Sequence, residues 1–322
     1  MLKKILISIL GLILVSALTA AWFFGPYYFK AQHFKANASN GYYADFYLYV
    51  SSGAQNIAES GGAATLLVQP NNSGTNSDDA SVHQKDAWMM GFERHKIAEE
   101  LNVVLLVPAF VRPAIDWEIY THALDRDALT TQREDLARID LQLIAMIEEA
   151  RSSLKAKGIQ SNQKVLLQGF SASGMFANRF TLLHPEHVLA VAVGSPGGWP
   201  VAPVSTFKNR LLSYPAGIAD IEILTGKPFD LAAFAAVPQI IIMGGDDDND
   251  SLDFTDGWDK DAATQVDSLF GSDPLSRWPH AEGLYKQAGV NAKFILVDGI
   301  GHDRKKLQSY GVDFFKEILS HQ

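Results

Sequence analysis

Short, continuously apolar segments alternate along most of the chain with longer segments of helical periodicity. The apolar segments are rich in Val, Ile and Leu and are bounded by Gly, Pro, Asn or Ser, which is typical of strands buried on both faces. The expected strands are 42–50, 64–68, 102–107, 164–170, 188–193, 239–243 and 293–297. Turn residues, such as those at 70–74, separate these strands from the next helical segments.

Helical segments lie between most of these strands. Leu136, Leu143 and Ile147 recur at helical spacing, predicting a helix over 131–154 that ends near Gly158. Further helices are expected at 86–101, 172–184, 276–288 and 304–319. The alternation predicts an α/β fold, with a mostly parallel, doubly wound sheet covered by helices on both faces.

The first 24 residues differ from the rest. Lys3 and Lys4 precede an apolar segment at 5–24, whose length matches the roughly 20 residues that span a bilayer. We expect a signal-anchor; the alternative is a cleaved signal peptide ending near Thr19-Ala20-Ala21. Either places the remaining chain outside the cytoplasm, membrane-anchored or secreted. The expected division is a signal segment at 1–24, a juxtamembrane segment at 25–41 and one α/β domain at 42–322, with a small cap at 201–237.

Composition excludes several function classes. The chain has 27 Lys and Arg against 36 Asp and Glu, a net charge of −9 and no basic stripe, so nucleic acid is not an expected partner. The absence of cysteine excludes disulfides, thiolate metal sites and a Cys nucleophile. The sequence contains neither a phosphate-binding Gly-rich loop nor a dinucleotide motif, so no cofactor is expected.

The segment Lys164–Phe180 places a serine between an expected strand and an expected helix. A nucleophile elbow needs small residues two positions before and two after its serine, and Ser171 has Gly169 and Ser173 there. Ser173 is the weaker candidate because Met175 would crowd its turn. The alternative is that these serines only cap the helix.

A serine nucleophile needs a base and an acid, which in this kind of fold follow in the order Ser, Asp or Glu, His. The loop after 239–243 supplies Asp246, Asp247 and Asp248, and the loop after 293–297 supplies His302 as the predicted base. A solvated acidic loop and a structural histidine are the alternatives.

Alternating carboxylates at Asp246, Asp248 and Asp250 also resemble a calcium loop. An EF-hand needs Gly at its sixth position and Glu at its twelfth, where this sequence has Ser251 and Gly257. No metal site is therefore predicted, with calcium of another geometry as the minor alternative.

The serine elbow, the Gly-Gly-Asp-Asp-Asp-Asn loop and the Asp-Gly-Ile-Gly-His segment together resemble the α/β-hydrolase superfamily, most of all esterases similar to polyhydroxybutyrate depolymerases. The resemblance covers about residue 64 to the C-terminus. It implies Ser171 as nucleophile, His302 as base and Asp247 as acid, with Asp246 and Asp248 as rivals. Ser173 departs from the family pattern, which has a second glycine there.

Acyl transfer also needs two N–H groups directed at the developing oxyanion. The amide of Ala172, next to the nucleophile, is the expected first donor, and Asn72 in the loop after 64–68 is the expected second, with Asn71 the next choice. Tyr120 and His122, in the loop after 102–107, are expected to contact substrate, against the alternative that they only pack.

The sequence therefore predicts a membrane-tethered or exported serine hydrolase that cleaves carboxylic esters, small or polymeric, through an acyl-enzyme intermediate. A peptidase with the same three residues is one alternative. A non-catalytic extracytoplasmic binding domain with the same fold is the other.

Overall fold

The computed structural model describes residues 25–72 and 74–321. The membrane-directed segment predicted at 1–24 lies outside the described residues. Within them, no helix combines the length and the apolar content that crossing a bilayer requires.

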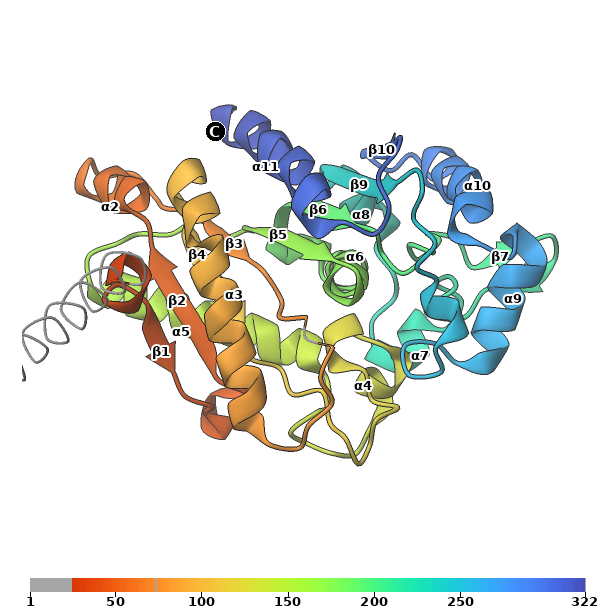
Figure 1. Ribbon diagram of the computed structural model, residues 1–322, viewed down its shortest axis with the longest axis horizontal. Helices are drawn as coiled ribbons and strands as arrows, with labels where there is room; N and C mark the ends of the chain where they lie inside the picture. The colour runs from red at the N-terminus through yellow and green to blue at the C-terminus, as the bar shows by residue number, and fades with distance from the viewer. Residues whose placement is uncertain (1–24, 73, 322) are drawn as a thin grey trace, which may run out of the picture.

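One eight-stranded sheet organises the described chain (Figure 1). Its strands run in the order β1-β2-β4-β3-β5-β6-β9-β10, with β1–β2 and β2–β4 antiparallel and every other pair parallel. The strands are β1 (Gln32–Phe34), β2 (Phe46–Val50), β3 (Leu66–Val68), β4 (Val104–Pro108), β5 (Val165–Phe170), β6 (Val188–Gly194), β9 (Gln239–Gly244) and β10 (Ala292–Val297). The predicted parallel sheet is thus present, with an antiparallel edge.

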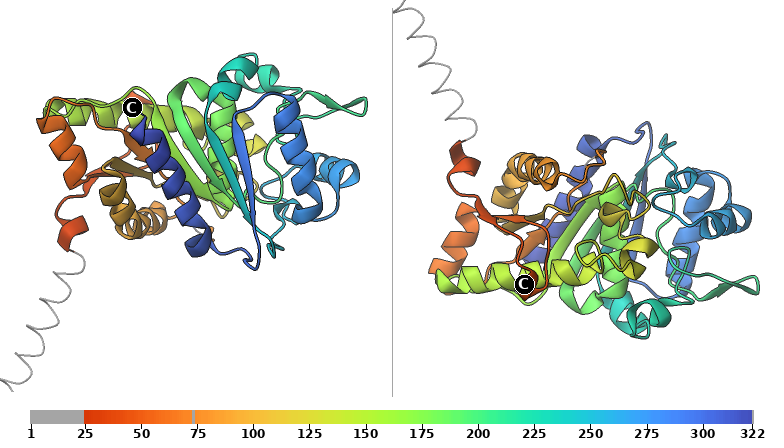
Figure 2. Two further views of the ribbon diagram at one scale, coloured as in Figure 1. Left: turned by 90° about the horizontal axis from the view of Figure 1, so that it is seen from above. Right: turned by 90° about the horizontal axis from the view of Figure 1, so that it is seen from below.

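Helices cover both faces of this sheet. In Figures 1 and 2, α3 and α11 lie on one side of it and α5 on the other. The helices are α2 (Ser52–Glu59), α3 (Ala80–Leu101), α4 (Arg126–Thr130), α5 (Ile139–Ala156), α6 (Ala172–Leu183), α7 (Ile221–Thr225), α8 (Leu231–Ala236), α9 (Lys260–Phe270), α10 (Pro274–Gln287) and α11 (Arg304–Ser320).

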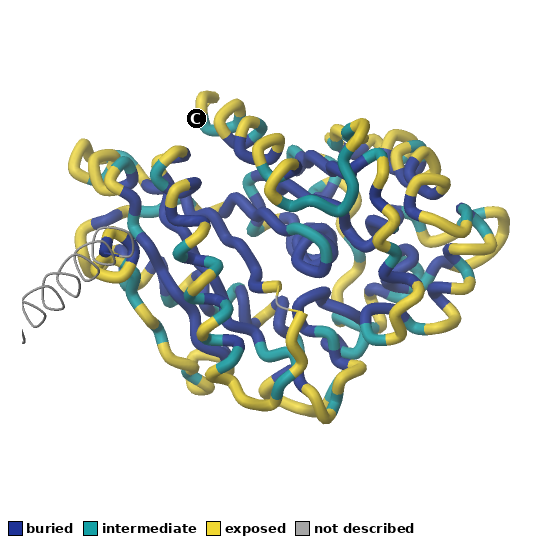
Figure 3. Tube along the Cα trace, in the orientation of Figure 1, coloured by how far each residue is buried: buried dark blue, intermediate teal, exposed yellow. Residues whose placement is uncertain are grey.

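Alternate strand residues contribute to two separate cores, because successive side chains point to opposite faces of a sheet. Leu167 packs in the cluster that contains α5 and α6, whereas its neighbour Leu166 packs in the cluster that contains α3 and α11. The inner strands are accordingly buried, whereas the edge strands β1 and β10 are only partly buried and the outer turns of the helices are exposed (Figure 3). This two-sided burial explains the continuous apolar segments in the sequence.

Several predicted boundaries differ from those observed. The helix predicted over 131–154 begins only at Ile139, because Arg138 has φ 47° and ψ 50°, a left-handed conformation that a helix cannot continue through. The helix predicted at 86–101 begins earlier, at Ala80, where the side chain of Asp79 caps it by accepting from the Ser81 amide. Helices α2, α4, α7, α8 and α9 and the edge strand β1 were not predicted.

The segment 201–237, the expected cap, forms a short hairpin of β7 (Thr206–Phe207) and β8 (Arg210–Leu211), followed by α7 and α8. Leu212 packs in a separate apolar cluster with residues of α9 and α10. Among the described residues, none from 201–237 lines either of the cavities that Ser171 borders.

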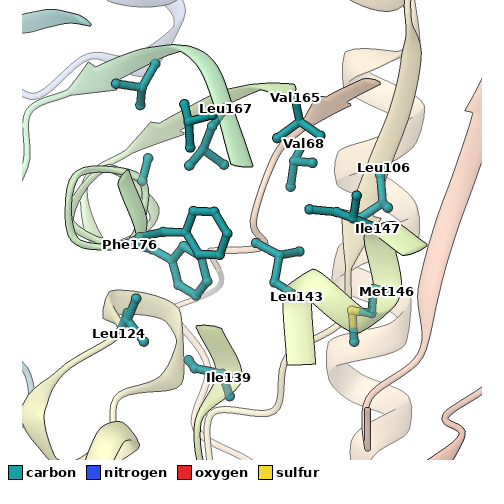
Figure 4. Close-up of a cluster of buried hydrophobic side chains, with 14 of the residues drawn as sticks. Val68, Leu106, Leu124, Ile139, Leu143, Met146, Ile147, Val165, Leu167 and Phe176 are labelled. Carbon is teal, nitrogen blue, oxygen red and sulfur yellow. The ribbon is translucent and has the colours of Figure 1, made fainter. Parts of the chain in front are cut away.

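Figure 4 shows the core between the sheet and α5 and α6, where Leu143, Ile147 and Phe176 meet Val68 and Leu167. Leu143 is fully buried. Removing most of its side chain leaves a cavity in addition to losing the transfer free energy.

We expect Leu143→Ala to lower the free energy of unfolding by about 2–5 kcal/mol, the range for buried leucines. Leu141→Ala on the same helix is the matched control, because Leu141 is 42% exposed. Urea unfolding followed by circular dichroism measures both, and equal effects of the two substitutions would contradict the assignment of the buried face.

Candidate active site

Ser171 lies at the sharp turn between β5 and α6. Its φ of 58° and ψ of −126° are strained for a residue with a side chain, and its amide donates to Gly194 O at 2.9 Å. Because Ser171 has no side-chain bond that caps α6, the alternative that it serves as a capping residue loses its physical basis. This sharp strand-to-helix turn is the backbone geometry that the predicted nucleophile elbow requires.

The elbow brings the backbones of β5, α6 and β6 close together. A Cβ on Gly169 would lie 1.8 Å from Ser173 O, and one on Gly174 would lie 2.4 Å from Gly194 O. Position 173 tolerates its side chain, since the Ser173 hydroxyl folds back to accept from the Phe170 amide and donate to the Phe170 carbonyl, both at 3.0 Å. The departure from the family pattern therefore reinforces the turn.

Asp247 and His302 meet at the carboxyl edge of the sheet, because β9 and β10 are parallel neighbours and each residue follows one of them. The His302 Nδ1 lies 3.0 and 3.1 Å from the two carboxylate oxygens of Asp247. The two loops are also joined through the backbone, where the Asp246 amide donates to Ile300 O at 2.9 Å. Gly244 permits this approach, since a Cβ there would lie 2.1 Å from Ile300 O.

Of the three rival acids, only Asp247 is buried, at 2% exposure, whereas Asp246 and Asp248 are exposed. Burial by itself raises the pKa of Asp247, but the hydrogen bond to His302, the nearby Ser195 hydroxyl and the charge of His302 outweigh it. The pKa of Asp247 is therefore lower than usual, and the carboxylate is ionised at neutral pH.

Ser171 and His302 border the same cavity, which has a volume of about 570 Å³. The His302 ring lies next to Phe170, the residue before Ser171, with ring centroids 4.6 Å apart. Since Nδ1 is occupied by Asp247, Nε2 is the ring nitrogen that remains for a proton exchange with a neighbouring hydroxyl.

The expected oxyanion donors lie beside this serine. Ala172 is the first residue of α6, so its amide belongs to the turn whose N–H groups have no partner within a helix. Asn72 borders the 570 Å³ cavity, and its side chain donates to Phe170 O at 2.9 Å. The side chain of Asn71 is instead buried, donating to Phe110 O at 2.9 Å and accepting from the Phe110 amide at 3.0 Å.

Tyr120 and His122 occupy different environments. Tyr120 lines a second cavity of about 230 Å³, which Ser171 also borders, and the guanidinium of Arg112 lies 4.1 Å from the centre of its ring. His122 is fully buried, with Nε2 3.0 Å from the side-chain nitrogen of Asn71. It lines neither cavity, so its predicted contact with substrate gives way to a packing role beneath the Asn71 loop.

Three polar residues at the site were missed in the sequence. Ser195 follows β6 directly, between the strands that carry Ser171 and Asp247, and its φ of 40° is unusual for serine. Arg94 and Arg304 line the 570 Å³ cavity. The position of Ser195 after an apolar strand was the available signal; nothing in the sequence marks Arg94 as buried.

A metal site is not apparent in the described part of the chain, where no three His, Asp or Glu side chains are grouped to hold an ion. Asp250, one of the alternating carboxylates, instead pairs with Arg277 at 2.8 Å. It also caps a short 3₁₀ helix, Ser251–Asp253, by accepting from the Leu252 amide.

Among solved structures, the chain is similar to poly(aspartic acid) hydrolase-1 from Sphingomonas sp. KT-1, with a TM-score of 0.57 and 17% identity over 89% of this chain and 98% of that one. It is also similar to a poly(3-hydroxybutyrate) depolymerase from Bordetella parapertussis, with a TM-score of 0.52 and 20% identity over 89% and 86% of the chains. A ferulic acid esterase matches at a TM-score of 0.50 and 10% identity over 90% and 97%.

No protein-family model and no curated protein matches the sequence. At these identities the structural likeness concerns the fold, and it confirms the predicted α/β-hydrolase architecture.

The depressed pKa of Asp247 links its charge to stability. Since the folded-state pKa is below the ordinary value of 3.8, the contribution of Asp247 is complete above that value and is lost as the pH falls through the folded-state pKa. We expect Asp247→Asn to lower the free energy of unfolding by about 1.5–3 kcal/mol at pH 7, the range for hydrogen bonds to charged groups.

The difference between wild type and Asp247→Asn is expected to shrink as the pH is lowered below about 4, the ordinary range of an Asp pKa. Urea unfolding across the pH range measures it, with the exposed Asp248→Asn as the matched control. A difference that persists unchanged in acid would show that the carboxylate charge does not carry the effect.

Proposed function

We propose that this α/β-hydrolase-fold protein is a serine hydrolase of carboxylic esters. The observation that carries the proposal is the buried Asp247 bonded to His302, which borders the same cavity as the strained Ser171. The order and the residue types are those that acyl transfer requires. The esterase and depolymerase names among the structural neighbours are consistent with an ester substrate.

In the proposed mechanism, His302 Nε2 accepts the Ser171 hydroxyl proton as Oγ attacks the ester carbonyl. Asp247 holds Nδ1–H and stabilises the imidazolium that forms. The amides of Ala172 and Asn72 donate to the oxyanion of the tetrahedral intermediate. His302 then returns the proton to the departing alcohol, which leaves the acyl group on Ser171.

The second half of the reaction repeats these steps with water. His302 deprotonates a water molecule, which attacks the acyl-enzyme, and the proton passes to Ser171 as the carboxylic acid leaves. Ser171 borders both the 230 Å³ cavity, which Tyr120 also lines, and the 570 Å³ cavity. Together the two cavities provide room for the acyl and alcohol parts of an ester.

We also propose that residues 1–24 carry this domain across a membrane, as an anchor or as a cleaved signal. The sequence pattern alone supports this. Intact-mass measurement of the mature protein distinguishes the two, because cleavage removes the mass of the segment.

Ser171→Ala is expected to reduce turnover of p-nitrophenyl butyrate by about 10³-fold or more while leaving the fold intact, because the acyl-enzyme can no longer form. Ser173→Ala is the matched control, because it removes the other serine hydroxyl that borders the 570 Å³ cavity, and its loss of turnover is expected to be far smaller since only the bonds to the Phe170 backbone are removed. Comparable loss in both variants would refute the assignment of Ser171.

A fluorophosphonate probe distinguishes this enzyme from a non-catalytic binding domain. Labelling at Ser171 is expected in wild type and absent in Ser171→Ala. One structural neighbour is a poly(aspartic acid) hydrolase, so hydrolysis of an amide bond is the second candidate function. Parallel assays on an ester and the matching anilide decide between the two bond types.

A further inference from the structure

The 570 Å³ cavity beside Ser171 contains a buried positive charge that the proposed mechanism does not use. Arg94, on α3, is 7% exposed and lines this cavity. Its Nη1 donates to the side-chain oxygen of Gln69 at 3.0 Å, and its Nε is buried with no hydrogen-bond partner among the described residues. Within residues 25–72 and 74–321, no carboxylate pairs with it at ion-pair distance.

An unpaired buried charge is costly, because desolvation is not offset by a counter-ion. Burial, followed by the charge of Arg304, lowers the pKa of Arg94 to about 9, which leaves the guanidinium protonated at neutral pH. The chain as a whole is acidic, so this cation is not part of a general positive surface. A buried arginine beside a cavity is thus a local feature with unsatisfied anion-binding capacity.

Arg304 adds a second guanidinium to the same cavity. It is the first residue of α11, two positions after His302, and its side chain is 30% exposed. Its hydrogen bonds go to Gln308 at 3.1 Å and to Glu93 at 2.9 Å. A guanidinium has five N–H donors, so these two bonds leave donors for a ligand.

Two acids also border the cavity, and neither forms an ion pair with Arg94, although the negative charge of Glu93 offsets part of the fall in the pKa of Arg94. Glu93 has its side chain half exposed and is paired with Arg304, and Asp86 is partly exposed on the preceding turns of α3. Glu93 and Asp86 are therefore more exposed to solvent than the buried guanidinium of Arg94. An anion that enters from solvent gains most at the buried end, where water screens charge least.

We propose that Arg94 and Arg304 bind a carboxylate of the substrate, so that the preferred esters carry a second, ionised carboxyl group on the part that occupies the 570 Å³ cavity. The expected effect on KM rests on the proposed ester hydrolysis. The binding of the carboxylate itself rests only on the two arginines. A planar carboxylate suits the guanidinium fork, which can donate two parallel hydrogen bonds.

The test compares esters that differ only in charge. Acetoxy carboxylic acids of increasing chain length place the carboxylate on the alcohol part, and monoethyl esters of dicarboxylic acids place it on the acyl part. Each acid is assayed beside its primary amide, which has nearly the same shape but no charge. We expect one of the two series to show a KM about tenfold or more lower for the acid than for its amide.

Arg304→Gln is expected to abolish the preference for the acid over its primary amide, because it removes the charge and keeps a hydrogen-bonding group. Arg94→Gln is expected to do the same if it folds; if it does not, Arg304→Gln decides. The matched control is Lys305→Gln, which removes an equal charge from the exposed neighbouring position of α11. The preference is expected to survive in that variant.

Calorimetry on Ser171→Ala separates this inference from the proposed function. The preferred acid is expected to bind this inactive variant and to lose about tenfold in affinity when Arg304→Gln is added. If the acid binds in this arginine-dependent way but wild type hydrolyses no ester, the ester-hydrolase proposal is refuted and the carboxylate site is not. Equal KM values for acids and amides in both series, a preference that persists in Arg304→Gln, or one lost equally in Lys305→Gln would overturn the carboxylate site.

Discussion

The parallel pairing of β5, β6, β9 and β10 is the constraint on which the rest of this molecule depends. Parallel strands end at one edge of a sheet, so the residues that follow them are brought together however far apart they lie in the chain. Asp247 and His302 touch because their strands are direct neighbours. Ser171 comes from β5 and reaches the same edge across β6, which contributes Ser195.

Burial then gives chemically similar groups different properties at this edge. Three consecutive aspartates differ in exposure, and only Asp247 is withdrawn from water and bonded to the imidazole. Arg94 and Arg304 carry the same guanidinium, yet Arg94 is enclosed with no ion pair among the described residues, whereas Arg304 is paired with Glu93 nearer to solvent. A carboxylate with a hydrogen-bonded partner is stable when buried, whereas a lone buried cation is stabilised when an anion binds beside it.

Much of the fold could be predicted because both faces of the central strands are buried. That burial requires continuous apolar segments in the sequence, such as those that form β5, β6 and β9. Boundaries were less predictable where one residue decides them, as the left-handed Arg138 does at the start of α5. Helix α9 was missed although its buried residues Ala262, Val266 and Phe270 recur at helical spacing, and they pack against the 201–237 region and α10.

The sequence by itself determined the strand-to-helix serine turn, the order of Ser171, the acidic loop and His302, and the small residues that let the chain turn sharply, because each is a local property of residue type and spacing. Only the tertiary structure decided which aspartate meets the imidazole, that His122 is buried beneath Asn71 rather than beside the cavity, and that Arg94 is enclosed beside Ser171. The reason is that solvent exposure and partner choice depend on neighbours supplied by distant segments, which local spacing does not specify.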